Sequence, residues 1–183
     1  MNNTYKLIAF LIFCLGFYAL YDFSSIIGAQ IKRSLNKPAR IVALYDLPKN
    51  LDSEINEEEG LYIINFFASW CGPCIKELPI LSEIAKKNNV PIYGVVINDR
   101  QNNAMSMLRE QGYEHLYKSI NFNFPIQKLI DLDIDRIPRM MIVMNKKVIY
   151  DHTGEINHRI LSKRILPLLE AAQNPTSQEG ANE

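Results

Sequence analysis

A near-continuous apolar run, LYIINFFA at positions 61–68, constrains the fold more than any other feature of this chain. A run of this length and composition is typical of a β-strand that is buried on both faces. It leads into WCGPC at positions 70–74, after which apolar residues recur every three or four positions on one side of a predicted helix. Pro73 suits the first turn of that helix, because the missing N–H would have no partner there. The sequence therefore places the cysteine pair at the junction of a buried strand and a helix.

The elements after this unit predict a mixed sheet. They follow in the order strand, helix, strand, strand, helix, at positions 91–97, 104–111, 139–143, 148–152 and 156–172. Gly112 is expected to cap the helix before it, and Pro167 to bend the last helix. The two strands around the Asn-Lys-Lys turn at 145–147 favour an antiparallel hairpin beside the parallel strand–helix–strand unit. We therefore predict an α/β fold with a mixed central sheet flanked by helices, and the cysteines at the edge where open α/β sheets carry their sites.

The chain has three cysteines, which are too few for a disulfide scaffold. Cys14 lies alone in an apolar stretch, where a small apolar side chain is its ordinary role. The pair Cys71 and Cys74 is either redox-active or half of a metal site. No further cysteine follows, and the histidines are scattered at positions 115, 152 and 158. Redox chemistry without a metal is therefore favoured, and a metal half-site or two idle core cysteines are the alternatives.

Thiol–disulfide exchange requires a thiol that ionises near neutral pH, since the thiolate is the nucleophile. At the predicted helix N-terminus, Cys71 would meet unpaired backbone N–H groups and the positive end of the helix dipole, both of which favour an anion. Cys74 lies three residues further on and is expected to point inward. We therefore predict Cys71 as the exposed nucleophile and Cys74 as the resolving thiol. Trp70 directly precedes the nucleophile and is expected to cover the dithiol.

Positions 1–30 form a candidate membrane segment. Every residue from 7 to 21 is apolar, aromatic or small, and a weaker apolar run continues to position 29. The longer count reaches the ~20 residues that span a bilayer, and no small-x-small cleavage site follows. A transmembrane anchor is therefore favoured over a cleaved signal helix. Basic residues flank the segment more strongly on its C-terminal side, which by itself would place the remainder in the cytoplasm.

The rest of the chain divides into three parts. Positions 31–59 are a polar, partly acidic lead-in, and positions 60–173 hold the predicted α/β domain. The tail at 174–183 is polar and lacks apolar anchors, so we expect it to be disordered. Twenty basic residues balance twenty acidic ones, so no net field favours nucleic acid as a partner.

The stretch FFASWCGPC at 66–74 resembles the active site of the thioredoxin superfamily. With Asn65 before it, it is similar to the membrane-anchored extracytoplasmic reductases, which carry Asn where cytosolic thioredoxins carry a buried, proton-accepting Asp. This difference implies that Asn65 supports a proton relay rather than acting as its acid. Four further stretches resemble one family more closely, the DsbE/CcmG thiol:disulfide interchange proteins of cytochrome c maturation. They lie at 37–39, 99–108, 152–157 and 166–168. The resemblance implies a thioredoxin-like fold.

The resemblance also implies roles for individual residues. Cys71 and Cys74 match the redox pair, whose disulfide is the only redox group expected, with no other cofactor. Glu77 matches an acidic residue that helps proton transfer to and from the dithiol, and burial beside the apolar stripe would raise its pKa. Pro138 matches a proline that is cis and packs beside the dithiol. The backbone of Ile137 would then offer an edge to an extended substrate segment.

The sequence departs from the family around this proline. The family usually has a glycine near it and an acidic residue after it, whereas this chain carries Arg136 before Pro138 and Arg139 after it. We expect the two arginines to change the electrostatic field felt by the thiolate and by the substrate. This departure bears most directly on which client protein is recognised.

The family implies a membrane-anchored reductase. It would be a single-pass protein of the inner (cytoplasmic) membrane whose catalytic domain faces the periplasm. The expected client is apocytochrome c or a cytochrome c maturation thiol protein, and the expected electron donor is a transmembrane thiol protein. A general extracytoplasmic reductase or oxidant with another client keeps the same chemistry and is the first alternative. The second alternative is a non-enzymatic interaction module or metal binder.

Overall fold

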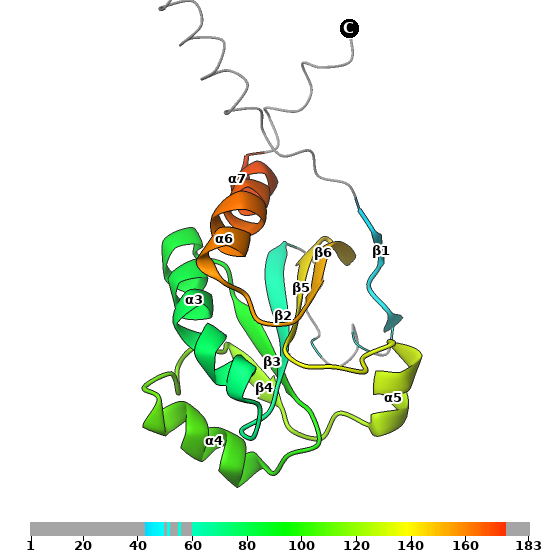
Figure 1. The fold of residues 1–183 in the computed structure, drawn as a ribbon. Helices are drawn as coiled ribbons and strands as arrows, with labels where there is room; N and C mark the ends of the chain where they lie inside the picture. The colour runs from blue at the N-terminus through cyan, green and yellow to red at the C-terminus, as the bar shows by residue number, and fades with distance from the viewer. Residues whose placement is uncertain (1–42, 50, 52–54, 56–59, 175–183) are drawn as a thin grey trace, which may run out of the picture. The chain divides into compact units, whose positions relative to one another are not determined.

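A six-stranded sheet in the order β1-β6-β5-β2-β3-β4 organises the described part of the chain (Figure 1). The computed structural model describes residues 43–49, 51, 55 and 60–174. The predicted anchor or signal helix at 1–30 and, apart from Asn174, the predicted disordered tail at 174–183 lie outside the described residues. Within those residues, no helix combines the length and the apolar character that crossing a membrane requires.

The sheet is mixed, as the sequence predicts. Its strands are β1 (Tyr45–Asp46), β2 (Leu61–Phe67), β3 (Ile92–Val96), β4 (Ser119–Asn121), β5 (Arg139–Met144) and β6 (Lys147–Thr153). The helices are α3 (Gly72–Asn88), α4 (Gln101–Glu110), α5 (Ile126–Asp131), α6 (His158–Ile160) and α7 (Leu166–Gln173), with a π-helical turn, η1 (Leu161–Ile165), before α7. β2, β3 and β4 are parallel, whereas β5 is antiparallel to both β2 and β6, and β1 is antiparallel to β6. The hairpin and the α/β architecture are therefore confirmed.

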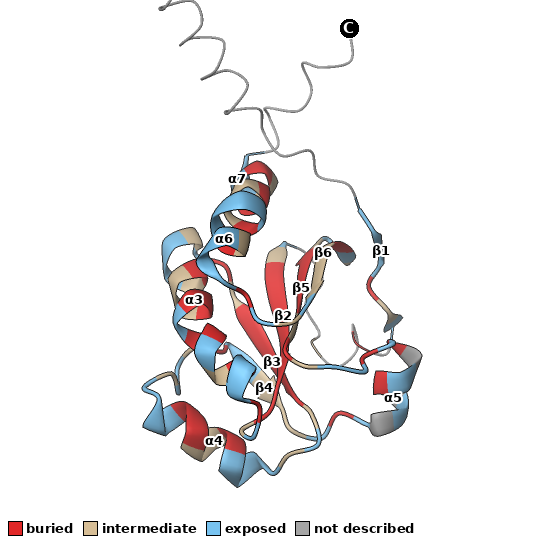
Figure 2. Ribbon diagram, in the orientation of Figure 1, coloured by how far each residue is buried: buried red, intermediate tan, exposed pale blue. Residues whose placement is uncertain are grey.

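Each face of the sheet carries its own apolar core. Helices α3, α4 and α7 cover one face with buried side chains such as Leu78, Leu108 and Leu169. The other face is covered by α5 and by the chain after β1, through Leu129 and Leu47. In Figure 2 the central strands are accordingly coloured as buried. β2 lies between β3 and β5, and all but its first residue is buried, which explains its uninterrupted apolar sequence.

Three elements were not predicted from the sequence: β1, β4 and α5. The two strands have two and three residues and the helix has six, so none is long enough to show a periodic pattern. β1 pairs with β6 through Tyr45 and Asp46, and Leu47 and Leu51 beyond it are buried. Part of the segment 31–59 therefore belongs to the sheet and to the core.

Helix boundaries differ slightly from the predicted ones. α4 begins at Gln101, three residues earlier than expected, and Arg100 before it has the extended backbone conformation of an N-cap residue. Gly112 follows the helix with φ +76°, a conformation that glycine adopts without steric cost, so its predicted capping role is confirmed. The last helix, which we predict to bend at Pro167, contains the π-helical turn η1 just before that proline, and there the N–H of Leu166 donates to the oxygen of Leu161.

Candidate active site

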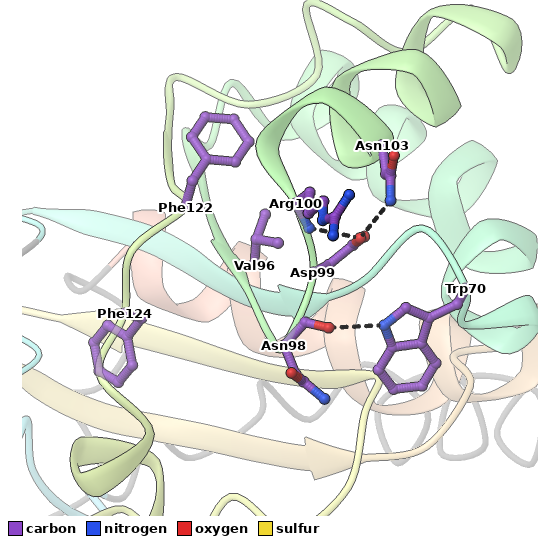
Figure 3. A pocket seen from close by; sticks show the side chains of 8 residues that line it. All are labelled: Trp70, Val96, Asn98, Asp99, Arg100, Asn103, Phe122 and Phe124. Atoms are coloured by element: carbon purple, nitrogen blue, oxygen red, sulfur yellow. Dashed lines mark hydrogen bonds between the residues drawn. The ribbon is translucent and has the colours of Figure 1, made fainter.

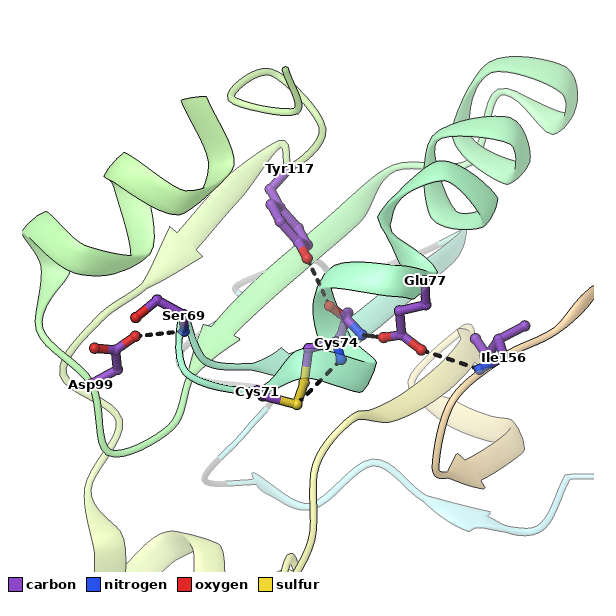
Figure 4. The surroundings of a disulfide bond; sticks show 8 residues. Ser69, Cys71, Cys74, Glu77, Asp99, Tyr117 and Ile156 are labelled. Atoms are coloured by element: carbon purple, nitrogen blue, oxygen red, sulfur yellow. Dashed lines mark hydrogen bonds between the residues drawn. A yellow bond between two sulfur atoms is a disulfide. The ribbon is translucent and has the colours of Figure 1, made fainter. Parts of the chain in front are cut away.

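The two cysteines lie where α3 begins and are joined by a disulfide (Figure 4). Cys71 is the N-cap residue, and its Sγ accepts a hydrogen bond from the backbone N of Cys74 at 3.2 Å. The predicted strand–helix junction is confirmed. Cys71 is 5% exposed and Cys74 is 1% exposed. The prediction of an exposed Cys71 is wrong for this oxidised form, because the disulfide turns its sulfur toward the helix, but Cys71 is the more accessible of the two.

Glu77, on α3, is a buried carboxyl group close to the cysteine pair (Figure 4). Its Oε1 accepts a hydrogen bond from Nδ2 of Asn65 at 2.8 Å, and its Oε2 accepts one from the backbone N of Ile156 at 3.4 Å. Burial raises the pKa of Glu77 from 4.5 to about 7, although both hydrogen bonds oppose the rise. A carboxyl group with this pKa can both accept and release a proton near neutral pH.

A tyrosine that no sequence pattern indicated holds Asn65 in place. Tyr117, in the loop before β4, donates its hydroxyl hydrogen bond to Oδ1 of Asn65 at 2.7 Å. Because the amide oxygen is occupied by this donor, the amide nitrogen faces Glu77. Burial, together with the charge of Glu77, raises the pKa of Tyr117 well above 10, so the hydroxyl remains a donor. Tyr117, Asn65 and Glu77 thus form a buried hydrogen-bonded chain that ends beside the dithiol.

A glycine in β3 makes room for this tyrosine. The rings of Phe67 and Tyr117 stack with their centroids 4.9 Å apart. A Cβ on Gly94 would lie 3.0 Å from Cε1 of Phe67, 3.1 Å from Cδ1 of Tyr117 and 3.3 Å from Ile120. Any side chain at position 94 would therefore push on both rings. A glycine inside an apolar strand marks a close approach of this kind, but by itself it does not identify Tyr117 as the approaching residue.

Asp99 ties the loop before Cys71 to the start of α4. Its Oδ2 accepts the backbone N–H of Ser69 at 2.6 Å, and its Oδ1 accepts the backbone N–H of Arg100 at 2.8 Å. Partial burial raises the pKa of Asp99, but the hydrogen bonds from Ser69, Arg100 and Asn103 outweigh it and the net shift is downward. Asp99 is therefore a stable carboxylate that positions the active-site loop, a role the sequence analysis did not assign to it.

Trp70 lies between two pockets beside the disulfide loop. Trp70 is 61% exposed, and its Nε1 donates to the backbone oxygen of Asn98 at 3.1 Å (Figure 3). One pocket has a volume of about 500 Å³ and is lined by Trp70, Val96, Asn98, Asp99, Arg100, Asn103, Phe122 and Phe124. The other has a volume of about 350 Å³ and is lined by Trp70, Ile97, Asn98, Ile134, Asp135, Arg136 and Ile137. Trp70 thus offers an apolar surface on both sides.

The peptide bond between Ile137 and Pro138 is cis, as expected. Ile137 lines the smaller pocket together with Trp70, so the proline loop and the disulfide loop face the same space. Pro138 is buried, and its carbonyl oxygen accepts the backbone N–H of Gly154 at 2.8 Å. The three residues expected to contact substrate, Trp70, Ile137 and Pro138, therefore come from two loops that converge beside the dithiol.

The two arginines next to this proline differ in their environment. Arg139 donates through Nε and Nη2 to both carboxylate oxygens of Asp151, at 2.9 and 2.7 Å, and through Nη1 to the backbone oxygen of Asp133 at 2.6 Å. Its charge is neutralised within the sheet, which corrects the expectation that both arginines act on the dithiol. Arg136 is exposed, lies 3.3 Å from Asp135 and lines the smaller pocket. Of these two arginines, Arg136 is the one that lies beside the candidate substrate site, with Asp135 as its ion-pair partner.

Comparisons with known proteins agree with this geometry. The Redoxin family model matches residues 37–165. The chain is 31% identical to the thiol:disulfide interchange protein CycY of Rhizobium leguminosarum bv. viciae over 127 residues, 69% of this chain and 66% of that protein. It is 29% identical to the DsbE homolog of Paracoccus denitrificans, over 67% of this chain and 66% of that one. It is 30% identical to DsbE of Vibrio cholerae, over 72% and 70% of the two chains. The match thus spans just under two thirds of the first two relatives.

Solved structures share the fold. The MTB dsbF protein superposes with a TM-score of 0.52 at 16% identity, over 60% of this chain and 81% of that one. A thioredoxin-related protein from Neisseria meningitidis serogroup B gives 0.50 at 22% identity, over 66% and 90% of the two chains. The sheet, the helix that begins at the cysteine pair and the cis-proline loop together define a protein of the thioredoxin-like class. The chain belongs to the Redoxin family and, within it, to the DsbE/CcmG group of thiol:disulfide interchange proteins.

Proposed function

We propose that this protein is a thiol–disulfide oxidoreductase in which Cys71 is the nucleophile and Cys74 the resolving thiol. The observation that carries the proposal is the disulfide at the first turn of α3, with a buried carboxyl group beside it. In the reduced protein, the Cys71 thiolate attacks a client disulfide, forms a mixed disulfide and releases one client thiolate. The Cys74 thiolate then attacks Sγ of Cys71 and releases the second client thiolate. The client gains two electrons, and Cys71 and Cys74 become a disulfide.

Glu77 supplies the proton acceptor for the second step. Cys74 must lose its proton before it attacks, and it is buried, which disfavours its thiolate. Glu77 is one helical turn away and has a pKa of about 7, raised by burial, so its ionised form is populated at neutral pH and can take that proton. Asn65 cannot serve as the acid, because an amide does not ionise, and it holds the Glu77 carboxylate by the 2.8 Å hydrogen bond.

The direction that we propose is reduction, and the client is apocytochrome c or a thiol protein of cytochrome c maturation. The DsbE and CycY relatives and the stretches that resemble this family support the assignment. The apolar segment at 1–30 would anchor the protein in the inner membrane with its catalytic domain in the periplasm, and a transmembrane thiol protein would return two electrons to the disulfide. A reporter fused after Glu183 tests this orientation, and reporter activity in the cytoplasm would contradict it.

A trapping experiment tests the chemistry and the client together. Cys74→Ser in the full chain removes the resolving thiol, so mixed disulfides through Cys71 should accumulate in cells. Cys71→Ser is the matched control and should trap no client. Recovery of a c-type cytochrome or a maturation thiol protein supports the client assignment, whereas a trap that holds neither contradicts it. Full function of the Cys71→Ser, Cys74→Ser double variant would contradict the enzymatic assignment itself.

The reduction potential separates a reductase from an oxidant. A reductase should have a reduction potential well below that of the strong oxidant DsbA, which is about −120 mV, and closer to that of thioredoxin, about −270 mV. Measurement of the dithiol–disulfide equilibrium in glutathione buffers gives this value directly. A potential near that of DsbA would support the oxidant instead.

A further inference from the structure

A basic pocket lies between the end of β6 and the last helical segment, and it shares no lining residue with the two pockets beside Trp70. It has a volume of about 380 Å³ and is lined by His152, Asn157, Arg159, Ile160, Lys163 and Arg164. The three cationic side chains are exposed and come from α6 and η1, whereas His152 comes from the sheet. We call these four side chains the basic pocket.

None of the three cations of the basic pocket forms an ion pair with a carboxylate among the described residues. The ion pairs of the described chain involve other residues, and Asp151, next to His152 in β6, is bound to Arg139. Arg164 lies near the Tyr150 hydroxyl, which is buried and has no hydrogen-bond partner among the described residues, and no carboxylate there forms an ion pair with Arg164. Three like charges around one space repel one another, and a bound anion relieves that repulsion.

The sheet side of the pocket carries a second indication of a ligand. Nε2 of His152 is inaccessible to water and has no hydrogen-bond partner among the described residues. Its ring stacks on that of Tyr150 with centroids 6.1 Å apart and planes at 11°, so the imidazole is held in place. Buried polar atoms are normally paired, and a ligand oxygen that enters the pocket would supply the missing partner.

The π-helical turn shapes the cationic side of the pocket. In η1 the Leu166 N–H donates to the Leu161 oxygen, five residues back, which widens the turn. Lys163 and Arg164 belong to this turn and Arg159 precedes it, and all three line the pocket. π-Helical turns are rare and occur frequently at functional sites.

We propose that the basic pocket binds a phosphate group. A single carboxylate would balance only one of the three cations, whereas a phosphate carries a charge of about −1.5 to −2 and several acceptor oxygens. Guanidinium groups bind phosphate oxygens through paired N–H donors, which suits Arg159 and Arg164. The phosphate is either free in solution or part of an anionic lipid headgroup.

Calorimetry on the full chain in non-ionic detergent tests the proposal. Inorganic phosphate and soluble short-chain phosphatidylglycerol are titrated separately, with short-chain phosphatidylcholine as the zwitterionic comparison. Saturable binding of phosphate or of phosphatidylglycerol is expected, and the tighter of the two identifies the source. The Arg159→Gln, Lys163→Gln variant should raise Kd at least about tenfold, since it removes two phosphate-binding cations.

Two further variants separate a built pocket from general surface charge. Lys86→Gln, Arg109→Gln removes one Lys and one Arg from exposed sites on other helices, and it should change Kd less than about twofold. His152→Phe keeps an aromatic ring on Tyr150 but removes the ring nitrogens, and it should also weaken binding. Absence of saturable binding by either probe would overturn the proposal. So would equal weakening by the pocket variant and the Lys86, Arg109 variant at unchanged melting temperature.

Discussion

Replacement of Glu77 by glutamine should make the stability of this protein less dependent on pH. Burial raises the pKa of Glu77 from 4.5 to about 7 in the folded protein, whereas the unfolded chain keeps the ordinary value. Between these two values the folded state binds more protons than the unfolded state, so the free energy of unfolding falls as the pH rises. The pKa of Glu77 differs by about 2.5 between the folded and unfolded states, which corresponds to about 3 kcal/mol of unfolding free energy. This amount is lost in full above pH 7 and is retained below pH 4.5.

Glutamine resembles the neutral carboxyl group and removes this loss. Its oxygen can still accept the hydrogen bond from Asn65, while its NH₂ group would face the Ile156 N–H at about the present 3.4 Å. That mismatch lowers stability by an amount that does not depend on pH. The difference in unfolding free energy between variant and parent should therefore shift by about 3 kcal/mol in favour of the variant between pH 4 and pH 8.

Urea denaturation of the oxidised protein at pH 4, 6 and 8 measures this difference. Glu110→Gln, an exposed carboxyl group on α4, is the matched control and should give a difference that hardly changes over the same range. A Glu77→Gln difference as flat as that of the control would refute the conclusion that Glu77 is held protonated by burial.

Further substitutions test the contacts around the site. Tyr117→Phe leaves Oδ1 of the buried Asn65 without its donor and should cost about 1–3 kcal/mol in urea denaturation. Arg139→Gln breaks a bidentate, mostly buried ion pair and should lower the free energy of unfolding by about 3 kcal/mol. The exposed Arg136→Gln should change it by less than about 0.5 kcal/mol. Equal effects of the two substitutions would contradict the different environments assigned to these arginines. Asp99→Asn weakens the acceptor of the Ser69 N–H, so hydrogen exchange at that amide should become faster, and an unchanged rate would argue against its role in the loop.

Local patterns in the sequence were sufficient to predict the centre of the fold. The apolar run of β2 and the spacing in α3 each extend over several residues, and the cysteines lie between them, so their junction follows from neighbours in the chain. β1 could not be predicted in the same way, because its two residues become a strand only by pairing with β6, about a hundred positions later.

The contacts that support the site could not be predicted from local sequence patterns either, because they join residues that are far apart in the chain. Tyr117 and Asn65 are 52 residues apart, and Asp99 and Ser69 are 30 apart, so their hydrogen bonds depend on the order of the strands. The environment of Arg139 likewise depends on the register of the β5–β6 hairpin, which brings Asp151 beside it. The family resemblance and the position beside the apolar stripe indicated Glu77, whereas the groups that set its pKa came from the three-dimensional arrangement.

The glycine at position 94 has a consequence for genetics. It carries no reactive group and lies in the middle of a strand, yet the empty space at its Cα is what allows the Tyr117 ring to stack on Phe67 and reach Asn65. A random screen for loss of function should therefore recover alleles of Gly94 together with alleles of the two cysteines. Second-site revertants of Gly94→Ala should map to Phe67, Tyr117 or Ile120, the side chains that would have to shrink or move.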